Sequence, residues 1–463
     1  MNFQEYFKGK KVTVMRIGLL GRGIGDAAYM AEAGAEVLVV DDAPQSVMQP
    51  AVDALSIYPN ITFHFGPYAL EDFEERDFIL VGAGAPLDLP CLEHARKAGV
   101  PLRQSAALFA QLSGVPVIGV TGTRGKSTVT QMIHHVLQFT TGEPVLLGGN
   151  IRGVSNLKLL REVTAESLCV MELDSWQLQG FGWQEMSPQV SVFTSFMPDH
   201  MNYYHDDMNA YFTDKAQIFL HQEESGVLIT TLPVFEWIKK VLPKVTLGQE
   251  FILADSSVIP EDCLLSMPGE HNRLNAALAY QALKATGLSD EEIFAGLASF
   301  PGVPGRLEHL GTILGIKVYN DNNATTPEAV AAGVLAVASG KNVVLIAGGA
   351  DKGLRLTAFL GVIEASVKAL VLIPGTGTTK LLAALAASSK TSQAIVAAVR
   401  QVATLAEAVE AGLAQAEPGD VLLFSPGFAS FGMFKNEYER NDEFVALVTA
   451  KQKAEDNKDV MQH

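Results

Sequence analysis

The chain has 463 residues, of which 48% are hydrophobic and 18% are charged, and its formal net charge is −17. This composition excludes a disordered chain, the length predicts about three domains, and the acidity without a long basic run argues against a nucleic-acid partner. The three cysteines are far apart, no apolar run approaches the roughly 18 residues of a membrane span, and the N-terminus lacks a signal-peptide pattern, so we expect a cytoplasmic protein with no membrane insertion.

The first segment, residues 1–113, has the outline of a Rossmann-like half. Apolar stretches at 12–17 and 35–41 read as strands, and a helix is expected between them. The turn after the first strand has the spacing Gly-x-x-Gly-x-Gly, and the second strand ends in two acids. A nucleotide diphosphate would contact such a turn, although the glycines could also merely reverse the chain. The candidate substrate-binding residues here are Gly18, Gly21, Arg22, Gly23, Asp41 and Asp42.

The second segment, residues 114–301, begins with an apolar strand at 117–121 that runs into a glycine turn ending in Gly-Lys-Ser-Thr. Apolar residues then recur with helical spacing. Backbone N–H groups at such a turn face phosphate oxygens, Lys126 would add a charge, and a hydroxyl of Ser127 or Thr128 would ligate Mg²⁺. The strict P-loop pattern fails because Val120 replaces its first glycine, so an ordinary glycine turn is the alternative. The candidate ATP-binding residues are Gly122, Thr123, Arg124, Gly125, Lys126, Ser127 and Thr128.

Two further strands of this segment end in polar residues. The stretch 168–171 is followed by Glu172, and the stretch 190–194 leads to Asp199 and His200. In a parallel sheet, strand ends of this kind face the same edge as the phosphate turn. We therefore expect a central mononucleotide-binding domain of the P-loop type.

The third segment, residues 302–463, repeats a strand followed by a Gly- or Pro-containing turn at 343–349, 369–375 and 421–427. Near-continuous apolar strands separated by Ala- and Leu-rich helices predict a buried parallel sheet. The whole chain is thus predicted to be an α/β protein of three domains: Rossmann-like, P-loop-type and doubly wound Rossmann-like.

The ordered motifs resemble the Mur ligase family over essentially the whole chain, and within it the branch that adds D-glutamate. They are residues 122–128, 172–178, Asp199-His200, Lys215, His271-Asn272-x-x-Asn275, residues 304–308, 321–325, 348–353 and 425–436. The resemblance implies that 1–113 binds a UDP substrate, 114–301 binds ATP and 302–463 binds the amino acid. It also implies an ATP-dependent ligase of peptidoglycan precursor synthesis, working through an acyl phosphate.

The family's functional residues carry over onto matching positions. The resemblance gives catalytic roles to Lys126, Glu172, His200 and Lys215, and magnesium ligation to Ser127, Thr128, Glu172, His200 and Lys215. It adds Asn272, Asn275, Arg306 and Asp321 to the ATP site, and Asn150, Asp174, His200, Lys352, Ser430 and Phe431 to the substrate sites. Two Mg²⁺ sites are implied, together with a carbamate on Lys215. The partners implied are a UDP-linked muramoyl substrate and D-glutamate, and we expect a monomer.

Five of these positions also have a plainer interpretation. Glu172 could be a satisfied strand-end acid, and Lys215 a solvated helix lysine. Asn275 could be a helix-face residue, Asp321 a turn or N-cap residue, and Lys352 a surface lysine.

The chain departs from the family pattern at several places. A usual lysine is Asn323, a usual serine is Asp174, and a usual aromatic residue is Glu437. The first domain has Gly82-Ala83-Gly84 and Arg103-Gln104 where other residues are usual. These departures concern recognition of UDP and of the amino acid rather than the ATP machinery.

Two alternatives remain open at this stage. The first is another Mur-type or folylpolyglutamate-like ligase. The second is a dinucleotide-dependent oxidoreductase, suggested by the 18–23 turn and Asp41, which leaves Lys126, Glu172 and Lys215 unexplained.

Overall fold

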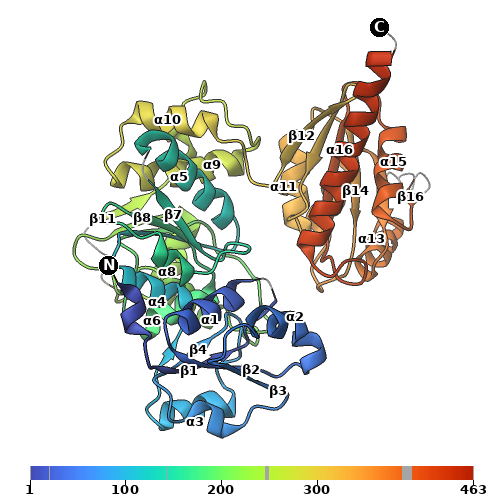
Figure 1. The fold of residues 1–463 in the computed structure, drawn as a ribbon. Helices are drawn as coiled ribbons and strands as arrows, with labels where there is room; N and C mark the ends of the chain where they lie inside the picture. The colour runs from blue at the N-terminus through green and yellow to red at the C-terminus, as the bar shows by residue number, and fades with distance from the viewer. Residues whose placement is uncertain (1, 20, 143, 246–249, 388–398, 462–463) are drawn as a thin grey trace. The chain divides into compact units, whose positions relative to one another are not determined.

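The computed structural model describes residues 2–19, 21–142, 144–245, 250–387 and 399–461. It divides into two compact units. The first holds Met1–Cys263 and Leu274–Leu297, and the second holds Leu264–Arg273 and Ala298–His463. Figure 1 colours both along the chain. The predicted boundaries after residues 113 and 301 stay predictions, although three separate sheets follow one another along the sequence.

The first sheet is fully parallel, with the order β3-β2-β1-β4-β5. Its strands are β1 (Lys11–Met15), β2 (Glu36–Asp41), β3 (Ile61–Phe65), β4 (Phe78–Val81) and β5 (Leu102–Arg103), and its helices are α1 (Arg22–Glu32), α2 (Gln45–Leu55), α3 (Pro90–Lys97) and α4 (Ser105–Ser113). The strand order reverses between β1 and β4, which is where open α/β sheets bind ligands.

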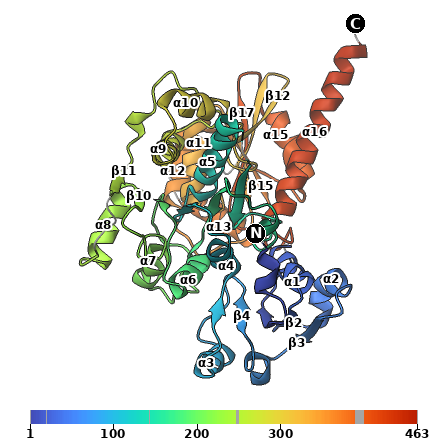
Figure 2. The ribbon, with the colours of Figure 1, turned by 60° about the vertical axis from the view of Figure 1, so that its left-hand side comes forward.

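The second sheet is also parallel, with the order β11-β10-β9-β6-β8-β7. Its strands are β6 (Val117–Thr121), β7 (Val145–Gly149), β8 (Leu168–Glu172), β9 (Val190–Phe193), β10 (Val227–Thr230) and β11 (Glu250–Leu253). The helices of this part are α5 (Lys126–Thr141), α6 (Ser175–Trp183), α7 (Met208–Ala216), α8 (Leu232–Val241), α9 (Glu270–Ala285) and α10 (Asp290–Ser299). The helix α4 packs against α6, so the first two sheets share one continuous core (Figure 2).

The third sheet has the order β12-β13-β17-β14-β15-β16 and is parallel except at β12, which runs antiparallel to β13. Its strands are β12 (Glu308–Ile313), β13 (Ile316–Asn320), β14 (Val343–Gly348), β15 (Val367–Ile373), β16 (Arg400–Gln401) and β17 (Val421–Gly427). Its helices are α11 (Pro327–Val337), α12 (Thr357–Ser366), α13 (Thr376–Ala387), α15 (Leu405–Gln415) and α16 (Glu437–Met461).

The predicted α/β class is confirmed, and all three strands predicted in the third segment are present as β14, β15 and β17. They are buried along their length apart from two residues of β15, as near-continuous apolar strands in a covered sheet should be. Among the described residues, no helix has both the length and the apolar character to cross a bilayer.

Candidate active site

The turn between β6 and α5 is a tight cradle that only glycine can form at two positions. Gly122 and Gly125 have φ angles of 145° and 87°. A Cβ on Gly122 would lie 2.1 Å from Thr194 Oγ1, and one on Gly125 would lie 2.5 Å from Asn275 Oδ1. The predicted helical stripe after Lys126 is buried, so α5 packs on the sheet with its N-terminus at the turn. Backbone N–H groups and the helix dipole therefore favour an anion there.

The segment after β9 holds this cradle in place, a role that sequence reasoning missed. The N–H of Thr123 donates to the Ser195 carbonyl at 2.8 Å, and the N–H of Arg124 donates to Ser195 Oγ at 2.9 Å. The Thr123 hydroxyl donates to the Met197 carbonyl at 3.1 Å. These bonds join the segments that follow the adjacent strands β6 and β9, and only the strand order could have indicated them.

Two lysines meet at the cradle. Both Lys126 Nζ and Lys215 Nζ donate to the carbonyl of Gly122 at 2.9 Å. Lys215 lies on α7 and is only 1% exposed, so its interpretation as a solvated helix lysine is wrong. Burial, followed by the nearby positive charge of Lys126, lowers the pKa of Lys215 well below its usual value. Burial of this kind makes it easier for a lysine to lose its proton than it is for a solvated lysine.

Glu172 ends β8 and His200 follows β9, the two strands that flank β6 in the same sheet. Glu172 ends β8, pairs with Val120 of β6 and is buried. The His200 ring lies 4.5 Å from the ring of Trp176, and burial is the main cause that lowers its pKa. The predicted catalytic residues of the first unit thus gather at the carboxyl ends of β6, β8 and β9 and at α7.

A magnesium ion would find few protein ligands here. Among the described residues, no group of three or more His, Cys, Asp or Glu side chains could hold a metal ion. Mg²⁺ usually keeps several waters and takes one or two carboxylates together with substrate phosphates, and Glu172 with the hydroxyls of Ser127 and Thr128 fits that donor set.

Asp174 has a structural role that the resemblance to the family did not predict. Its carboxylate accepts the N–H of Gln177 at 2.8 Å, and the Gln177 amide oxygen accepts the N–H of Asp174 at 3.2 Å. This reciprocal capping box stabilises the start of α6. Its substrate contact stays a prediction.

A pocket of about 270 Å³ opens at the β1–β4 reversal of the first sheet. Gly18, Arg22 and Gly23 line it, as the glycine-turn interpretation requires, and Gly21 caps the start of α1. Arg22 also donates to the Asn150 side chain, which brings two predicted substrate residues together from distant parts of the chain. Asp41 and Asp42 do not line this pocket.

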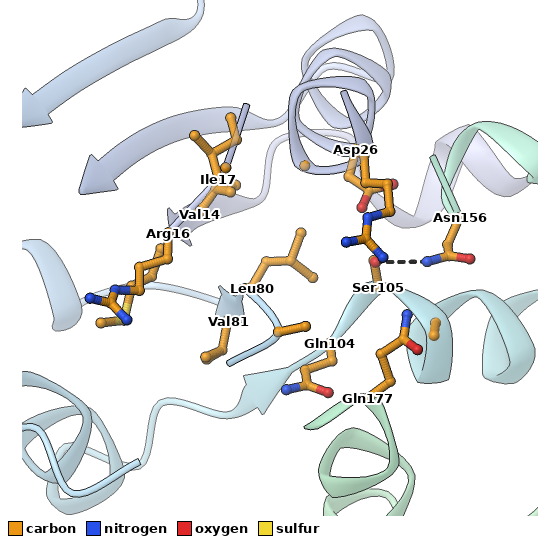
Figure 3. A pocket seen from close by; sticks show the side chains of 17 residues that line it. Val14, Arg16, Ile17, Asp26, Leu80, Val81, Gln104, Ser105, Asn156 and Gln177 are labelled. Carbon is orange, nitrogen blue, oxygen red and sulfur yellow. Dashed lines mark hydrogen bonds between the residues drawn. The ribbon is translucent and has the colours of Figure 1, made fainter. Parts of the chain in front are cut away.

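Several polar residues of this pocket were missed from sequence, among them Asp26, Ser105 and Asn156. Asp26 is buried on α1 and accepts from the Ser155 hydroxyl at 2.6 Å and from the Leu157 N–H at 2.9 Å. In Figure 3 the Asn156 amide donates to Ser105, and Leu80 and Val81 lie between this side of the pocket and Arg16. The sequence offered one sign of Asp26: it is a charged residue on an otherwise apolar face of its helix.

The two acids at the end of β2 are held by local contacts. Asp42 forms an ion pair with Arg16 at 2.9 Å, and the hydrogen bond from Arg16 holds the pKa of Asp42 below its usual value. Asp41 is buried and accepts the N–H of Ala43 at 3.0 Å, and burial raises its pKa. Both acids remain predicted substrate contacts.

In the second unit, the loops after β13, β14 and β17 meet at one edge of the third sheet. Gly427 donates its N–H to the Ala324 carbonyl at 2.8 Å, and Ala350 and Ala429 form a short antiparallel bridge. Lys352 Nζ donates to Thr325 Oγ1 at 3.2 Å. The bridge also brings the neighbouring Ser430 and Phe431 next to the Lys352 loop, and Phe431 is 63% exposed.

Two of the family departures, Asn323 and Glu437, take part in local hydrogen bonds of this unit. Asn323 donates its N–H to the Gly305 carbonyl at 2.9 Å, and Glu437 begins α16 and accepts from Asn322 through its carbonyl at 2.9 Å. Arg440 holds Asn322, which lies next to Asn323 and bonds to Glu437. Arg440 is fully buried and donates to Asn322 and to the Phe428 carbonyl.

The remaining predicted ATP residues lie on different elements. Asn272 on α9 donates to the Pro268 carbonyl at 2.9 Å, and Asn275 stands three residues later on the same helix, over Gly125. Arg306 follows the 303–306 turn of the second unit. The nucleotide contacts of these residues stay predictions.

Asp321 is buried in the second unit. Its carboxylate accepts from the Ser425 hydroxyl at 2.8 Å and from the Leu307 N–H at 3.2 Å. Burial outweighs these bonds and the charge of Arg306, and raises the pKa of Asp321 to about 7.

This shift predicts a pH-dependent stability. The native state binds the Asp321 proton more tightly than the unfolded chain, whose aspartate has a pKa of about 3.9. The free energy of unfolding should therefore fall as pH rises from about 4 to about 7, by roughly a few kcal/mol, and level off above. Urea unfolding of the parent and of Asp321→Asn from about pH 5 to about pH 8 tests this. The variant should show a flatter profile; parallel profiles would contradict the assignment.

The chain is similar in sequence to known proteins. A family model described as "Mur ligase middle domain" matches residues 120–244, and one described as "Mur ligase, glutamate ligase domain" matches residues 305–428. The UDP-N-acetylmuramoylalanine–D-glutamate ligase of Roseiflexus sp. (strain RS-1) is 33% identical over 95% of this chain and 98% of that protein. The chain belongs to the Mur ligase family. The ligase of the same name from Geobacillus kaustophilus (strain HTA426) is 32% identical to this Mur ligase, over 96% and 98% of the two chains.

Solved structures share the fold of this Mur ligase. UDP-N-acetylmuramate–alanine ligase from Thermotoga maritima has a TM-score of 0.58 at 18% identity, over 95% of this chain and 99% of that one. MurF from Acinetobacter baumannii has a TM-score of 0.54 at 16% identity, over 96% and 91%. The E. coli FolC complex with DHPP and ADP has a TM-score of 0.52 at 18% identity, over 75% and 93%. These likenesses support the fold alone.

Proposed function

We propose that this Mur ligase is an ATP-dependent enzyme that joins D-glutamate to UDP-N-acetylmuramoyl-L-alanine in peptidoglycan precursor synthesis. The observation that carries the proposal is the gathering of a phosphate cradle, the strand-end acid Glu172 and the buried Lys215 at one edge of the second sheet. Near-full-length relatives that bear the name of that activity support it.

The chemistry must turn an inert carboxylate into an electrophile. A carboxylate oxygen of the muramoyl substrate attacks the γ-phosphorus of ATP and ADP leaves, which gives an acyl phosphate. The amine of the amino acid then attacks the acyl carbon, loses a proton, and phosphate leaves as the amide forms. Almost all the reactants are anionic, so positioning and charge neutralisation carry the catalysis.

The cradle residues have separate tasks in this scheme. Lys126, now bonded to the Gly122 carbonyl, would turn to the β/γ-phosphates, and the N–H groups of residues 122–128 would bind phosphate oxygens. Ser127, Thr128 and Glu172 would hold Mg²⁺, which when bound neutralises phosphate charge. Asn272, Asn275, Arg306 and Asp321 complete the proposed ATP set.

A second Mg²⁺ would lie near His200 and Lys215. We propose that Lys215 reacts with CO₂ to become a carbamate, because a buried cation beside a metal is unfavourable whereas an anionic oxygen ligand is not. The lowered pKa of Lys215 supports this, since only the neutral amine attacks CO₂.

The substrates would bind at the two other sheet edges. The UDP part is proposed to occupy the β1–β4 pocket, with its diphosphate on the glycine turn and Arg22, and Asn150, Asp174 and His200 on the way to the reacting carboxylate. The amino acid is proposed to bind Lys352, Ser430 and Phe431. We further propose that the protein works as a cytoplasmic monomer, where ATP and the UDP-linked substrate occur.

An ATP-dependent phosphate-release screen tests the function. Purified protein receives Mg·ATP, UDP-N-acetylmuramoyl-L-alanine and, in turn, D-glutamate, L-glutamate and other amino acids. Phosphate should appear only when both acceptors are present, and fastest with D-glutamate. Phosphate release with a folate acceptor instead would favour the folylpolyglutamate-like alternative, and NAD binding with indifference to ATP would favour the oxidoreductase.

A further inference from the structure

The loop that carries Lys352 connects β14 to α12 without regular secondary structure of its own. Gly349 and Gly353 within it have φ angles of 134° and 77°, so its backbone is shaped by glycine rather than by a helix or strand. Lys352 lies between them with an exposed side chain whose ammonium donates to Thr325 at 3.2 Å. A long lysine side chain on such a loop can place its charge accurately only if the loop itself is anchored.

The anchor is a second lysine, Lys380, on α13. Its ammonium donates to both carboxylate oxygens of Asp351, at 3.1 and 2.9 Å, and to the Leu354 carbonyl at 2.8 Å. Asp351 and Leu354 lie on either side of Lys352. One cation thus holds the loop before and after the residue that faces the proposed amino-acid site.

We call the contacts of Lys380 with Asp351 and Leu354 the clip. The first turn of α13 adds a further contact to it. The N–H of Asp351 donates to the Thr376 hydroxyl at 2.9 Å, and Thr376 stands one helical turn before Lys380, on the same face of α13. Within the loop, the N–H of Gly353 donates to Asp351 Oδ1 at 3.1 Å. The loop therefore has backbone, side-chain and ionic attachments to one rigid helix.

The clip also has an electrostatic consequence. Asp351 is the immediate neighbour of Lys352 and is the nearest carboxylate in sequence that could neutralise it. Lys380 binds both carboxylate oxygens of Asp351, so the negative charge of Asp351 is neutralised by Lys380 rather than by Lys352. An anionic substrate would then meet a Lys352 ammonium whose charge Asp351 does not neutralise.

We propose that Lys380 is a positioning residue for the amino-acid substrate, acting through Asp351 to hold the Lys352 loop and to keep the Asp351 carboxylate from pairing with Lys352. The inference rests on the proposed function, because it assigns Lys352 to the amino-acid carboxylate. The prediction concerns binding of the amino acid alone, since Lys380 belongs to the second unit, whereas the phosphate cradle and the β1–β4 pocket belong to the first.

Steady-state kinetics of Lys380→Met test the proposal. The KM for the amino acid should rise about tenfold, as expected when a charge-assisted contact is weakened, while kcat and the KM for ATP stay within about twofold. Lys380→Arg should recover most of the loss, and Lys341→Met, an exposed lysine of the same unit, should behave as the parent. An unchanged amino-acid KM, or an equal rise in the KM for ATP, would overturn the proposal.

The double variant Lys380→Met/Asp351→Asn separates positioning from general destabilisation. Removing the released carboxylate should restore part of the amino-acid affinity, so the two substitutions should be less harmful together than their sum. A double variant whose amino-acid KM is additive or worse than additive would reject the electrostatic part of the proposal.

Hydrogen–deuterium exchange of peptides covering residues 349–355 gives a readout that needs no substrate. In Lys380→Met the amides of Asp351 and Gly353 should exchange at least about tenfold faster than in the parent, because their hydrogen bonds depend on the clip. If the parent shows no ligase activity, the proposed function fails while faster exchange still supports the clip. Unchanged exchange would contradict the clip whatever the activity.

Discussion

Lys215→Ala is expected to lower kcat by about a thousandfold, or roughly 4 kcal/mol of transition-state stabilisation, because it removes the proposed anionic ligand of the second metal. In the protein as described, Lys215 is buried beside Tyr211 and shares the Gly122 carbonyl with Lys126. Steady-state phosphate release with all three substrates measures the effect. Lys244→Ala, at an exposed lysine of the same unit, is the matched control and should keep parental kcat.

Removing CO₂ from the buffer independently tests the proposed carbamate on Lys215. Activity of the parent should fall in CO₂-depleted buffer and return when bicarbonate is added, whereas Lys215→Ala should not respond. Because alanine leaves a cavity in place of a buried side chain, thermal unfolding of Lys215→Ala and Lys215→Met is compared with the parent. Near-normal turnover in a folded variant would refute the carbamate.

Lys126→Met is expected to abolish measurable ligation, with kcat lowered by at least about a thousandfold, because the β/γ-phosphate charge that develops in transfer loses its fixed cation. Methionine keeps the length and apolar stem of the side chain, and helix α5 remains anchored by its buried face. The same variant should bind Mg·ATP more weakly, by about tenfold to a hundredfold in equilibrium titration.

The control for this variant is Lys158→Met, an exposed lysine of the same unit. It should keep both ATP affinity and turnover. If Lys126→Met bound Mg·ATP and released phosphate as the parent does, the turn would be an ordinary glycine turn, and the interpretation of residues 114–301 as an ATP-binding domain would fall with it.

The sequence predicted the phosphate cradle because its information is local. Strand, glycine turn, Lys126 and the helical stripe follow one another within about one β–α unit, and only glycine fits at Gly122 and Gly125 for reasons of backbone geometry. The same holds for the repeated strands of the third segment, whose burial follows from their continuous apolar character.

Contacts between distant segments could not be predicted in this way. The burial of Lys215 against the Gly122 carbonyl joins positions 93 residues apart, and an isolated helix lysine has the same local pattern whether it is solvated or buried. Asp26 with Ser155, and Lys380 with Asp351, are further pairs brought together only by the packing of helices on sheets.

By itself, then, the sequence determined the α/β class, the glycine turn between β6 and α5, and the family to which this Mur ligase belongs, because propensity, spacing and glycine geometry are properties of neighbouring residues. The tertiary structure decided which carboxylates and amines are buried, which charges compensate one another and which loops share an edge. Those properties depend on desolvation and on strand order, and neither is written in any short stretch of the chain.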